Sequence, residues 1–591
     1  MKGFGEFQKI KKVNGNIKQN KLLQEEIIDK AIRFHLKGNI NEAYKLYQKC
    51  IKFGSLDPYL FSNYGIILKG LGKLKESEQA LRKAIKLKPE FPEAYSNLGS
   101  VLRDIGSLGE SEKALRKAIE LKPELPEAHL NLGNVLRDIG SLSESEKAFL
   151  KAIDLNPEYA EAFSNLGNVL REIGNPIKAE KVLNKAIKLN PKFATSYFNL
   201  SNVFRDLGKL QESEKALRKA IDLNPQYAKA YSNLGNLLRD LGNLQESEKA
   251  LLKAIDLNPQ FAKAYYSLSI FRASEETKIV YEKLFSEEIL HNKTDEEKID
   301  IYFARANFLH QEKKYEGSTN FLDLANNLQK KIKASNLDSI IQKSQYLLEI
   351  SERQNMNNIE KINLPETIFI VGMPRSGSTL LESILDMNED VFGLGETTIL
   401  DDLFQKIEES NNLSNLAEQY TIKSQELSKN KKITINKNLY NYQYAGIISK
   451  YITNAKIINC VRNPLDNILS IYRANFAKGH GYASCLQDCS KLFLHQEELI
   501  KRYKKIYPSK IYSLDYDLLV NNPIKEIKSL INWLAWKWDE KYLLHHQNKR
   551  PIFTASSIQA RFPINSKSVG GWKNYENMLK PAIQILGNIN F

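Results

Sequence analysis

Residues 371–379 read Val-Gly-Met-Pro-Arg-Ser-Gly-Ser-Thr, and this stretch predicts the fold of the second half of the chain. It follows the β-branched apolar run Thr367–Val371 and precedes a helical pattern over Leu380–Met387. A strand, a glycine-rich turn and a helix N-terminus in this order bind phosphate through backbone N–H groups and the helix dipole. The spacing matches the P-loop, G-x-x-x-x-G-K-S/T, except that Ser378 replaces the lysine. With Arg375 as its cation, the loop suits a phosphate-like anion handled without the metal of a kinase.

Apolar strands alternate with helices from Glu366 to the C-terminus. The strand candidates are Thr367–Val371, Ile433–Asn436, Ala455–Val461 and Ile511–Leu514. This alternation predicts an α/β domain over residues 366–591, with a parallel sheet covered by helices. In such sheets the ligand lies beyond the carboxyl ends of the strands, so we expect the functional side chains there.

The composition of the 591 residues is that of a large globular protein with several domains: 42% are hydrophobic, and the net charge is +15. The chain has no run of about 18 apolar residues, so no membrane span is expected. The Lys- and Asn-rich extension 1–24 lacks the apolar core of a signal peptide. The four cysteines lack zinc-site spacing, which favours a cytoplasmic protein with reduced thiols and no metal. Lysines are mixed with glutamates along the chain, so local anion sites are favoured over a nucleic-acid partner.

The first half of the chain consists of a repeat with a period of 34 residues. The period is marked by Pro89, Pro123, Pro157, Pro191, Pro225 and Pro259. Each unit has two helical patterns joined by a glycine turn, and it resembles the tetratricopeptide repeat. The resemblance implies an all-α tetratricopeptide-repeat superhelix over residues 25–272, because one unit cannot bury its apolar face alone.

Periodicity weakens in residues 273–350, where helices are expected at Glu275–Leu290, Asp295–Gln311 and Tyr315–Ile332. We interpret these helices as a degenerate repeat that caps the solenoid. The polar, Asn-rich residues 351–365 are the predicted linker to the α/β domain.

An asparagine recurs at one position in the first helix of successive repeats. The six positions are Asn63, Asn97, Asn131, Asn165, Asn199 and Asn233. Within one repeat, Asn131, Asn134 and Asp138 share a helical face, which in tetratricopeptide arrays lines the concave groove. The stripe resembles the asparagine ladder of the O-linked N-acetylglucosamine transferase, where side-chain amides hold an extended peptide. This resemblance implies a polypeptide partner or substrate; recent duplication of one unit would leave the same asparagines without a binding role.

The α/β half resembles the sulfotransferases in three segments. Pro374–Thr379 is similar to their 5′-phosphosulfate loop, Lys456–Ser470 to their 3′-phosphate motif, and Ser513–Val520 to their third common segment. Together with the repeats, these segments resemble a bacterial class related to the protein-tyrosine sulfotransferases. The resemblance implies a P-loop-like α/β fold and transfer of a sulfuryl group from 3′-phosphoadenosine 5′-phosphosulfate (PAPS) to a hydroxyl acceptor. Protein tyrosine, a glycan and a small molecule stay open as acceptors.

PAPS carries two separate anionic groups, and the sequence offers two anion sites. The site for the 5′-phosphosulfate would consist of Arg375, Ser376, Gly377, Ser378 and Thr379. The 3′-phosphate would lie on Arg462 and Ser470, where a guanidinium fork matches the phosphate. By resemblance, Tyr516 would flank the nucleotide, and Ser556 would contact the cofactor phosphate and assist transfer.

Transfer to a hydroxyl requires a base for the acceptor proton and cations for the leaving phosphate. By resemblance, Glu396 on a glycine-flanked loop is the general base, although an acidic residue there would also suit the start of a helix at Thr398–Ile407. Lys437, at a strand end, resembles the family's transition-state lysine, and Arg375 would share its role.

Three positions depart from the family's pattern. Asn436–Leu439 reads Asn-Lys-Asn-Leu where the family often has Asp-Lys-x-Pro, and Gly571 precedes Trp572 where it commonly has Lys or Arg. Thr397–Asp402 is neutral and then acidic, whereas animal tyrosine sulfotransferases have basic residues there that read acidic peptides. We therefore expect an acceptor that differs from an acidic tyrosine site.

Two other functions stay open on the sequence. Ser378 at the lysine position disfavours a P-loop nucleotide kinase, and no second metal-binding carboxylate is convincing. A non-catalytic tetratricopeptide scaffold is disfavoured because the predicted anion-site and catalytic residues are all retained.

Overall fold

The computed structural model describes residues 26–271, 275–353, 365–408, 413–428, 431–476, 479–548, 550–554 and 556–587. Within these ranges, no helix has the length and apolar character needed to cross a lipid bilayer. The chain divides into two compact units, Met1–Pro225 and Gln226–Phe591. The second unit therefore contains the last repeat helices as well as the sheet. The predicted extension 1–24 and residues 354–364 of the predicted linker lie outside the described residues.

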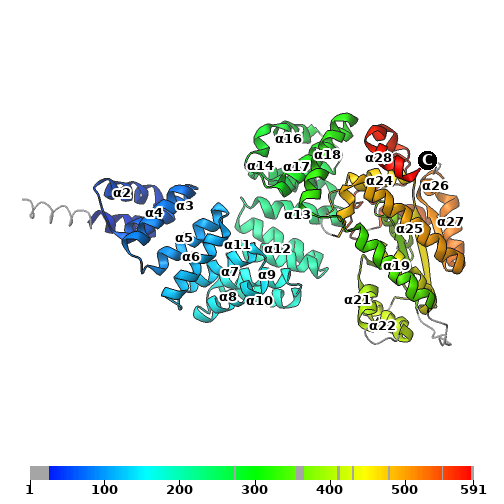
Figure 1. Cartoon of the computed structure of the whole chain (residues 1–591), viewed down its shortest axis with the longest axis horizontal. Coiled ribbons are helices and arrows are strands. Elements are labelled where there is room, and N and C mark those ends of the chain that lie inside the picture. Colours follow the sequence, from blue (N-terminus) through cyan, green and yellow to red (C-terminus); the bar gives the residue numbers. More distant parts are fainter. Residues whose placement is uncertain are drawn as a thin grey trace, which may run out of the picture. The chain divides into compact units, whose positions relative to one another are not determined.

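The first unit consists of paired helices (Figure 1). They include α2 (Ile40–Lys52), α3 (Pro58–Gly70), α4 (Leu74–Leu87), α5 (Pro92–Ile105), α6 (Leu108–Leu121), α7 (Pro126–Ile139), α8 (Leu142–Leu155), α9 (Ala160–Glu172), α10 (Pro176–Leu189), α11 (Ala194–Asp206) and α12 (Leu210–Leu223). Gly106 ends α5 at a φ of 91°, in the left-handed region that glycine adopts without steric cost. The all-α repeat region is thereby confirmed.

The two helices of a repeat approach each other closely at a glycine. A Cβ built on Gly133 of α7 would stand 2.7 Å from the ring of Phe149 on α8. The Ser145 hydroxyl, also on α8, donates a buried hydrogen bond of 2.7 Å to the Gly133 carbonyl. The preceding repeat has the same contact, from Ser111 to Gly99. Close packing therefore depends on a residue without a side chain and on a hydroxyl that reaches its carbonyl.

The second unit begins with further helices. These are α13 (Ala228–Leu241), α14 (Leu244–Leu257), α15 (Ala262–Ser269), α16 (Glu275–Phe285), α17 (Asp295–Gln311), α18 (Tyr315–Ile332) and α19 (Leu337–Arg353). The three helices expected after the repeats are observed as α16, α17 and α18. Helix α19 was not predicted, and it includes Ser351–Arg353 of the predicted linker. It forms because Leu347 joins the core of the α/β fold and Gln443 donates a hydrogen bond of 2.9 Å to the Ile340 carbonyl.

A five-stranded sheet follows, with the order β2-β3-β1-β4-β5. The strands are β1 (Glu366–Gly372), β2 (Val391–Gly395), β3 (Ile433–Asn436), β4 (Ala455–Val461) and β5 (Ile511–Asp515). All neighbouring strands are parallel, which confirms the predicted α/β fold. The edge strand β2 was missed because two of its five residues are glycines, and its pairing with β3 is shifted between Gly393 and Gly395.

Helices cover both faces of this sheet. They are α20 (Ser378–Leu385), α21 (Ile399–Glu408), α22 (Leu416–Ser428), α23 (Ala445–Tyr451), α24 (Pro464–Tyr472), α25 (Leu486–Ile506), α26 (Tyr516–Asn521), α27 (Pro523–Leu534) and α28 (Glu576–Leu586). Successive residues of β1 join different cores: Phe369 packs with Tyr420, and Ile368 packs in the cluster of Leu381. This alternation is what a strand buried on both faces requires.

Within the second unit, the repeat-like helices contact the α/β fold directly. The backbone N–H of Ile552 donates a hydrogen bond of 2.9 Å to the carbonyl of Asp240 in α13. His310 on α17 is hydrogen-bonded to the Tyr575 hydroxyl at 2.8 Å. Asn326 on α18 donates to the carbonyl of Tyr472, the last residue of α24, at 3.0 Å.

We expect Gly133→Ala to lower the stability of the repeats by about 1–3 kcal/mol, because a methyl group there overpacks the contact with Phe149. Urea unfolding of the full chain, followed by far-UV circular dichroism, measures the change. Gly109→Ala is the matched control, since Gly109 is exposed within α6 and a Cβ there meets nothing within 4 Å. The control should gain up to about 1 kcal/mol, because alanine is the better helix former. An unchanged midpoint for Gly133→Ala would contradict the packing argument.

Candidate active site

The loop between β1 and α20 is fixed by close contacts with its neighbours. Gly372 has a φ of 142°, and a Cβ there would stand 2.6 Å from the Cys460 carbonyl oxygen of β4. Gly377, with a φ of 94°, precedes the first turn of α20, and a Cβ there would overlap the ring of Tyr516. Arg375 has a φ of 67°, a left-handed conformation that is strained for a residue with a side chain. The loop therefore holds Arg375 in a fixed orientation between two strand ends.

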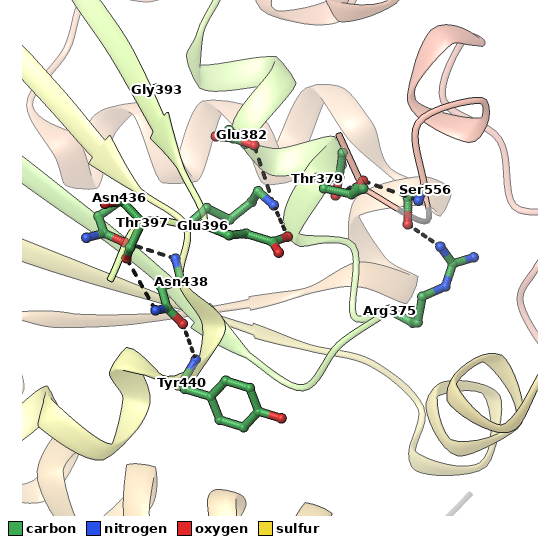
Figure 2. Close-up of polar contacts among 12 residues, drawn as sticks. Arg375, Thr379, Glu382, Gly393, Glu396, Thr397, Asn436, Asn438, Tyr440 and Ser556 are labelled. Carbon is green, nitrogen blue, oxygen red and sulfur yellow. Dashed lines mark hydrogen bonds and ion pairs between the residues drawn. The ribbon is translucent and has the colours of Figure 1, made fainter. Parts of the chain in front are cut away.

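The Arg375 guanidinium is hydrogen-bonded on each of its nitrogens, and every partner is uncharged. Nε donates to the Ser470 hydroxyl at 3.0 Å, and Nη2 donates to Gln559 Oε1 at 3.1 Å. Nη1 donates to the Ser556 hydroxyl, a contact drawn in Figure 2. The structure thus brings the predicted residues Arg375, Ser470 and Ser556 together. Gln559, three residues after Ser556, was not predicted as a site residue, and it reaches the loop through the fold.

Further cations surround Arg375. Burial, followed by the charges of Arg462 and Arg473, lowers the pKa of Arg375 to about 10. Arg473 follows α24, three residues after Ser470, and donates a hydrogen bond of 3.0 Å to His310 Nε2. Burial and then Arg473 lower the pKa of His310 to about 3, so this imidazole is a neutral acceptor at physiological pH. Arg473 was missed, although its i+3 spacing from Ser470 places both on one helical face. Positive charge without a neighbouring carboxylate is the electrostatic condition of an anion site.

Arg462 follows the last residue of β4 and lies beside the loop. Nη1 donates to the Arg375 carbonyl at 3.0 Å, and Nη2 donates to the Ser568 carbonyl at 2.8 Å. The guanidinium stacks on the ring of Tyr516 at 4.9 Å, and the Tyr516 hydroxyl lies 3.0 Å from the Ser568 hydroxyl. The predicted residues Arg462 and Tyr516 are therefore in contact, whereas the Ser470 hydroxyl is bound to Arg375. Backbone atoms of the segment before Gly571 complete this side of the site.

Several buried polar atoms in this region lack a partner within the described part of the chain, Arg473 Nε and Asn467 Oδ1 among them. Among the described residues, the buried Ser376 hydroxyl and the buried Nε of Arg462 have no hydrogen bond. Ser378 and Thr379 form the first turn of α20, and the Thr379 hydroxyl lies 3.1 Å from that of Thr554. The described residues contain no group of three or more His, Cys, Asp or Glu side chains that could hold a metal ion. The site thus offers hydroxyls, guanidinium groups and a helix N-terminus to an anion.

Glu396 and Lys437 form an ion pair at the same edge of the sheet. Glu396 follows β2, Lys437 follows β3, and the Lys437 N–H donates to the Gly395 carbonyl at 2.8 Å. The Lys437 ammonium then lies 2.7 Å from Glu396 Oε1 (Figure 2). The Lys437 side chain is 2% exposed and that of Glu396 is 57% exposed. A buried cation therefore lies behind a carboxylate that solvent can reach.

The loop after Lys437 is held by asparagines instead of the family's aspartate and proline. Asn436 Oδ1 accepts the Asn438 N–H at 3.0 Å, and Asn438 Oδ1 accepts the Tyr440 N–H at 3.2 Å. The Asn438 amide also donates to the Thr397 carbonyl at 3.3 Å. These contacts join the loops that follow β2 and β3, so the departure in sequence keeps Lys437 beside Glu396.

Two residues next to Lys437 were missed by sequence reasoning. Glu382, on α20, lies 3.8 Å from the Lys437 ammonium and accepts a hydrogen bond of 2.8 Å from Arg550. Arg550 also donates to the Gly393 carbonyl at 3.3 Å and lies 3.4 Å from Asp386. In the sequence, Glu382 is a polar residue in a largely apolar helical pattern, and Arg550 belongs to no motif identified in the sequence. Their pairing spans 168 residues, so no local signal indicates it.

The repeated asparagines make contacts between neighbouring repeats. The side-chain amides of Asn97 and Asn131 donate to the hydroxyls of Ser62 and Ser96, and that of Asn165 donates to Asn134 Oδ1. Asn199 donates to the Ser164 hydroxyl and carbonyl. Asn63 and Asn233 hold the equivalent positions of α3 and α13. Each of the four amide N–H₂ groups thus has a partner within the array.

Profiles of known protein families match segments in both halves of the chain. The profile of the sulfotransferase family matches residues 365–425 and 408–540. A profile of the TPR repeat matches residues 65–106, 99–140, 133–174 and 201–242, and profiles of the tetratricopeptide repeat match residues 160–193 and 228–261.

Individual relatives cover parts of the chain. An uncharacterized protein of Aquifex aeolicus is 31% identical over 242 residues, which are 37% of this chain and 32% of that protein, so this chain spans less than half of it. A putative protein-tyrosine sulfotransferase of Caenorhabditis briggsae is 25% identical over 236 residues, or 36% of this chain and 81% of that protein. A solved tetratricopeptide repeat protein from Parabacteroides merdae aligns at a TM-score of 0.36 and 19% identity, covering 42% of this chain and 97% of the other. The matches to the family profiles show that this chain carries tetratricopeptide repeats and a domain of the sulfotransferase family.

Proposed function

We propose that this chain transfers a sulfuryl group from PAPS to a hydroxyl acceptor. The observation that carries the proposal is that Arg375 and Arg462, which are in contact, follow strands at the same sheet edge as the Glu396–Lys437 ion pair. The match to the sulfotransferase family supports the reaction class. The identity of the donor and the roles of the residues are part of the proposal.

The residues of the loop fit a donor with two anionic groups. Within the described residues, Arg375 and Arg462 donate hydrogen bonds to uncharged oxygens, and Asp517 is a carboxylate near Arg462, so the cluster keeps positive charge for a ligand. The buried Ser376 hydroxyl and Arg462 Nε lack a partner among the described residues, and a phosphate or sulfate oxygen would satisfy both. Tyr516, stacked on Arg462, offers a face to the nucleotide. When bound, PAPS supplies a sulfuryl group that a good phosphate leaving group activates.

The exposed carboxylate and the buried ammonium suit two different tasks. Glu396 can accept a proton from an acceptor hydroxyl, because solvent reaches its side chain while Lys437 contacts one of its oxygens. Lys437 and Arg375 place positive charge where negative charge develops on the leaving oxygen. Ser556 accepts a hydrogen bond from Arg375, and this contact holds the segment after residue 550 beside the guanidinium group.

The repeats supply a surface for a polypeptide. Because the amide N–H₂ groups of Asn97, Asn131, Asn165 and Asn199 are used between repeats, their amide oxygens remain as acceptors for peptide N–H groups. Tetratricopeptide arrays form extended concave binding surfaces. We include in the proposal that the repeats bind a polypeptide partner or substrate.

The acceptor need not be an acidic peptide. Helix α21, which follows Glu396, carries Asp401 and Asp402 in its first turn. Asp401 is paired with Lys343 at 2.6 Å, and Asp402 accepts a hydrogen bond from the Thr398 hydroxyl at 3.1 Å. Acidic side chains at this position would repel acidic acceptors, so neutral hydroxyl acceptors fit better.

Glu396→Gln should lower kcat for sulfuryl transfer by at least about 100-fold, because the amide cannot accept the proton. Affinity for 3′-phosphoadenosine 5′-phosphate should stay within about twofold, since Glu396 lies apart from the arginines. Transfer of labelled sulfate to a panel of phenols, peptides and glycans measures the first quantity, and isothermal titration calorimetry measures the second. Glu389→Gln is the control, because Glu389 is exposed two residues before β2. Activity near that of the wild type would remove Glu396 as the base.

Arg462→Met should weaken binding of 3′-phosphoadenosine 5′-phosphate by about 10–100-fold, through loss of a charge-assisted contact. Binding of adenosine 5′-phosphate, which lacks the 3′-phosphate, should change little. Calorimetry on both nucleotides gives the ratio of the two affinities. Arg502→Met, which removes an exposed arginine paired with Glu352, is the control. Equal weakening of both nucleotides would show that Arg462 supports the fold instead of the 3′-phosphate.

Replacing Asn131, Asn165 and Asn199 together by alanine should reduce sulfation of protein acceptors by about tenfold, since several weak hydrogen bonds are lost at once. Sulfation of a small phenol should be unchanged. Labelled PAPS with host lysate, followed by identification of the labelled proteins, measures the first effect. Asn184→Ala, at an exposed position of α10, is the control. A parallel loss on the small phenol would contradict a substrate role for the groove.

A further inference from the structure

The geometry points to Glu382 and Arg550 as a positioning pair that sets where the Lys437 ammonium lies and so controls its contact with the sulfate of the donor. This inference rests on the proposed function, because it takes Lys437 as the residue that faces the sulfate. Neither residue belongs to a motif of the sequence, and both act through Lys437.

The pair belongs to a chain of alternating charges. Asp386, Arg550, Glu382, Lys437 and Glu396 follow one another at 3.4, 2.8, 3.8 and 2.7 Å. The Lys437 amine is in contact with both carboxylates, those of Glu382 and Glu396. The lysine is therefore shared between one carboxylate of the core and one that faces solvent.

Glu382 lies in an environment that disfavours a carboxylate. Its side chain is 8% exposed, and its helix, α20, packs Leu381, Ile384 and Leu385 into the core under the sheet. A buried carboxylate is costly unless it is paired and hydrogen-bonded. Arg550, at 2.8 Å, balances this carboxylate, and Lys437 lies beside it at 3.8 Å, so the charge of Glu382 acts on both cations.

The second carboxylate changes what Lys437 can do. If Glu396 were its only partner, the Lys437 ammonium would stay paired with the proposed base. Neither group could then act on a ligand. Glu382 holds Lys437 when Glu396 turns to an acceptor hydroxyl. Arg550 shares the charge of Glu382 through a hydrogen bond of 2.8 Å, so Glu382 does not fully neutralise the ammonium. Lys437 thereby keeps positive charge for a sulfate oxygen.

The same contacts also hold elements together. Arg550 joins α20 to the Gly393 carbonyl of β2, and a Cβ on Gly393 would overlap its guanidinium. Loss of either residue alone removes one charge from this buried network and should lower stability. A stability loss therefore cannot distinguish a positioning role from a structural one, and a double variant is required.

The test compares Glu382→Gln, Arg550→Met and the double variant in the full chain. Isothermal titration calorimetry gives the affinities for PAPS and for 3′-phosphoadenosine 5′-phosphate, which lacks the sulfate; their ratio reports the sulfate contact without turnover. We expect each single variant to lower the unfolding temperature and to reduce this ratio about tenfold. The double variant should regain part of the unfolding temperature, since a neutral pair replaces the ion pair of Glu382 and Arg550, while Asp386 loses its ion pair and keeps its hydrogen bond from Asn548. Its affinity ratio and its kcat should stay low, because Lys437 still lacks the Glu382 carboxylate.

Glu366→Gln is the matched control. Glu366 forms a half-buried ion pair of 3.1 Å with Lys456 at the opposite end of the sheet. This variant should lose stability and keep the affinity ratio of the wild type. Recovery of the ratio and of kcat along with stability in the double variant would overturn the positioning role.

The proposed function can fail separately. A wild-type chain that binds both nucleotides but sulfates no acceptor would overturn the proposed transfer, while the affinity ratios would still decide the role of Glu382 and Arg550. A wild-type chain that binds neither nucleotide would overturn both proposals.

Discussion

The parallel pairing of β1 with β3 and β4 is the constraint on which the site depends. Because all strands run in one direction, the loops that follow them emerge at one edge of the sheet. Arg375 follows β1, Glu396 follows β2, Lys437 follows β3, and Arg462 follows β4. Side chains that are far apart in the sequence, from residue 375 to residue 462, thus lie at one edge of the sheet, because each follows its own strand. A site built this way is as rigid as the sheet that supports it.

The cations of this edge fall into two groups that differ in their partners. Arg375, Arg462 and Arg473 are hydrogen-bonded to hydroxyls, carbonyls and a neutral imidazole. Lys437 and Arg550 are paired with carboxylates. Guanidinium groups with neutral partners keep their full charge for a ligand, whereas an ammonium between carboxylates has its position set and its charge partly balanced. In the proposed function, the first group serves anion affinity and the second serves placement of charge at the reacting atoms.

The repeats and most of the sheet could be predicted because their signals are local. A period of 34 residues places each helix, and β-branched runs mark β1, β3 and β4. Strand β2 has two glycines and no such run, and it forms because its neighbour β3 offers a free edge. The site was predictable only where a motif carries it: Arg375 and Arg462 lie in motifs, whereas the contacts of Gln559 and Arg550 join segments more than 150 residues apart. Such contacts are products of the tertiary fold, which no local pattern encodes.

The asparagines of the repeats serve the fold through contacts between repeats, and in the proposed function they also serve a binding surface. A carboxamide has two donor hydrogens on its nitrogen and two lone pairs on its oxygen. In Asn97 and Asn131 the nitrogen is bound to a serine of the preceding repeat, which sets the rotation of one repeat on the next. In Asn165 the nitrogen is bound instead to Asn134 Oδ1, so the direction of the amide differs between repeats. In the proposed function, an amide whose nitrogen is held within the array offers its oxygen to a backbone N–H group of a polypeptide. Duplication of one unit would preserve the same asparagines and the same contacts, so binding of a polypeptide, and not the contacts between repeats, distinguishes the two explanations.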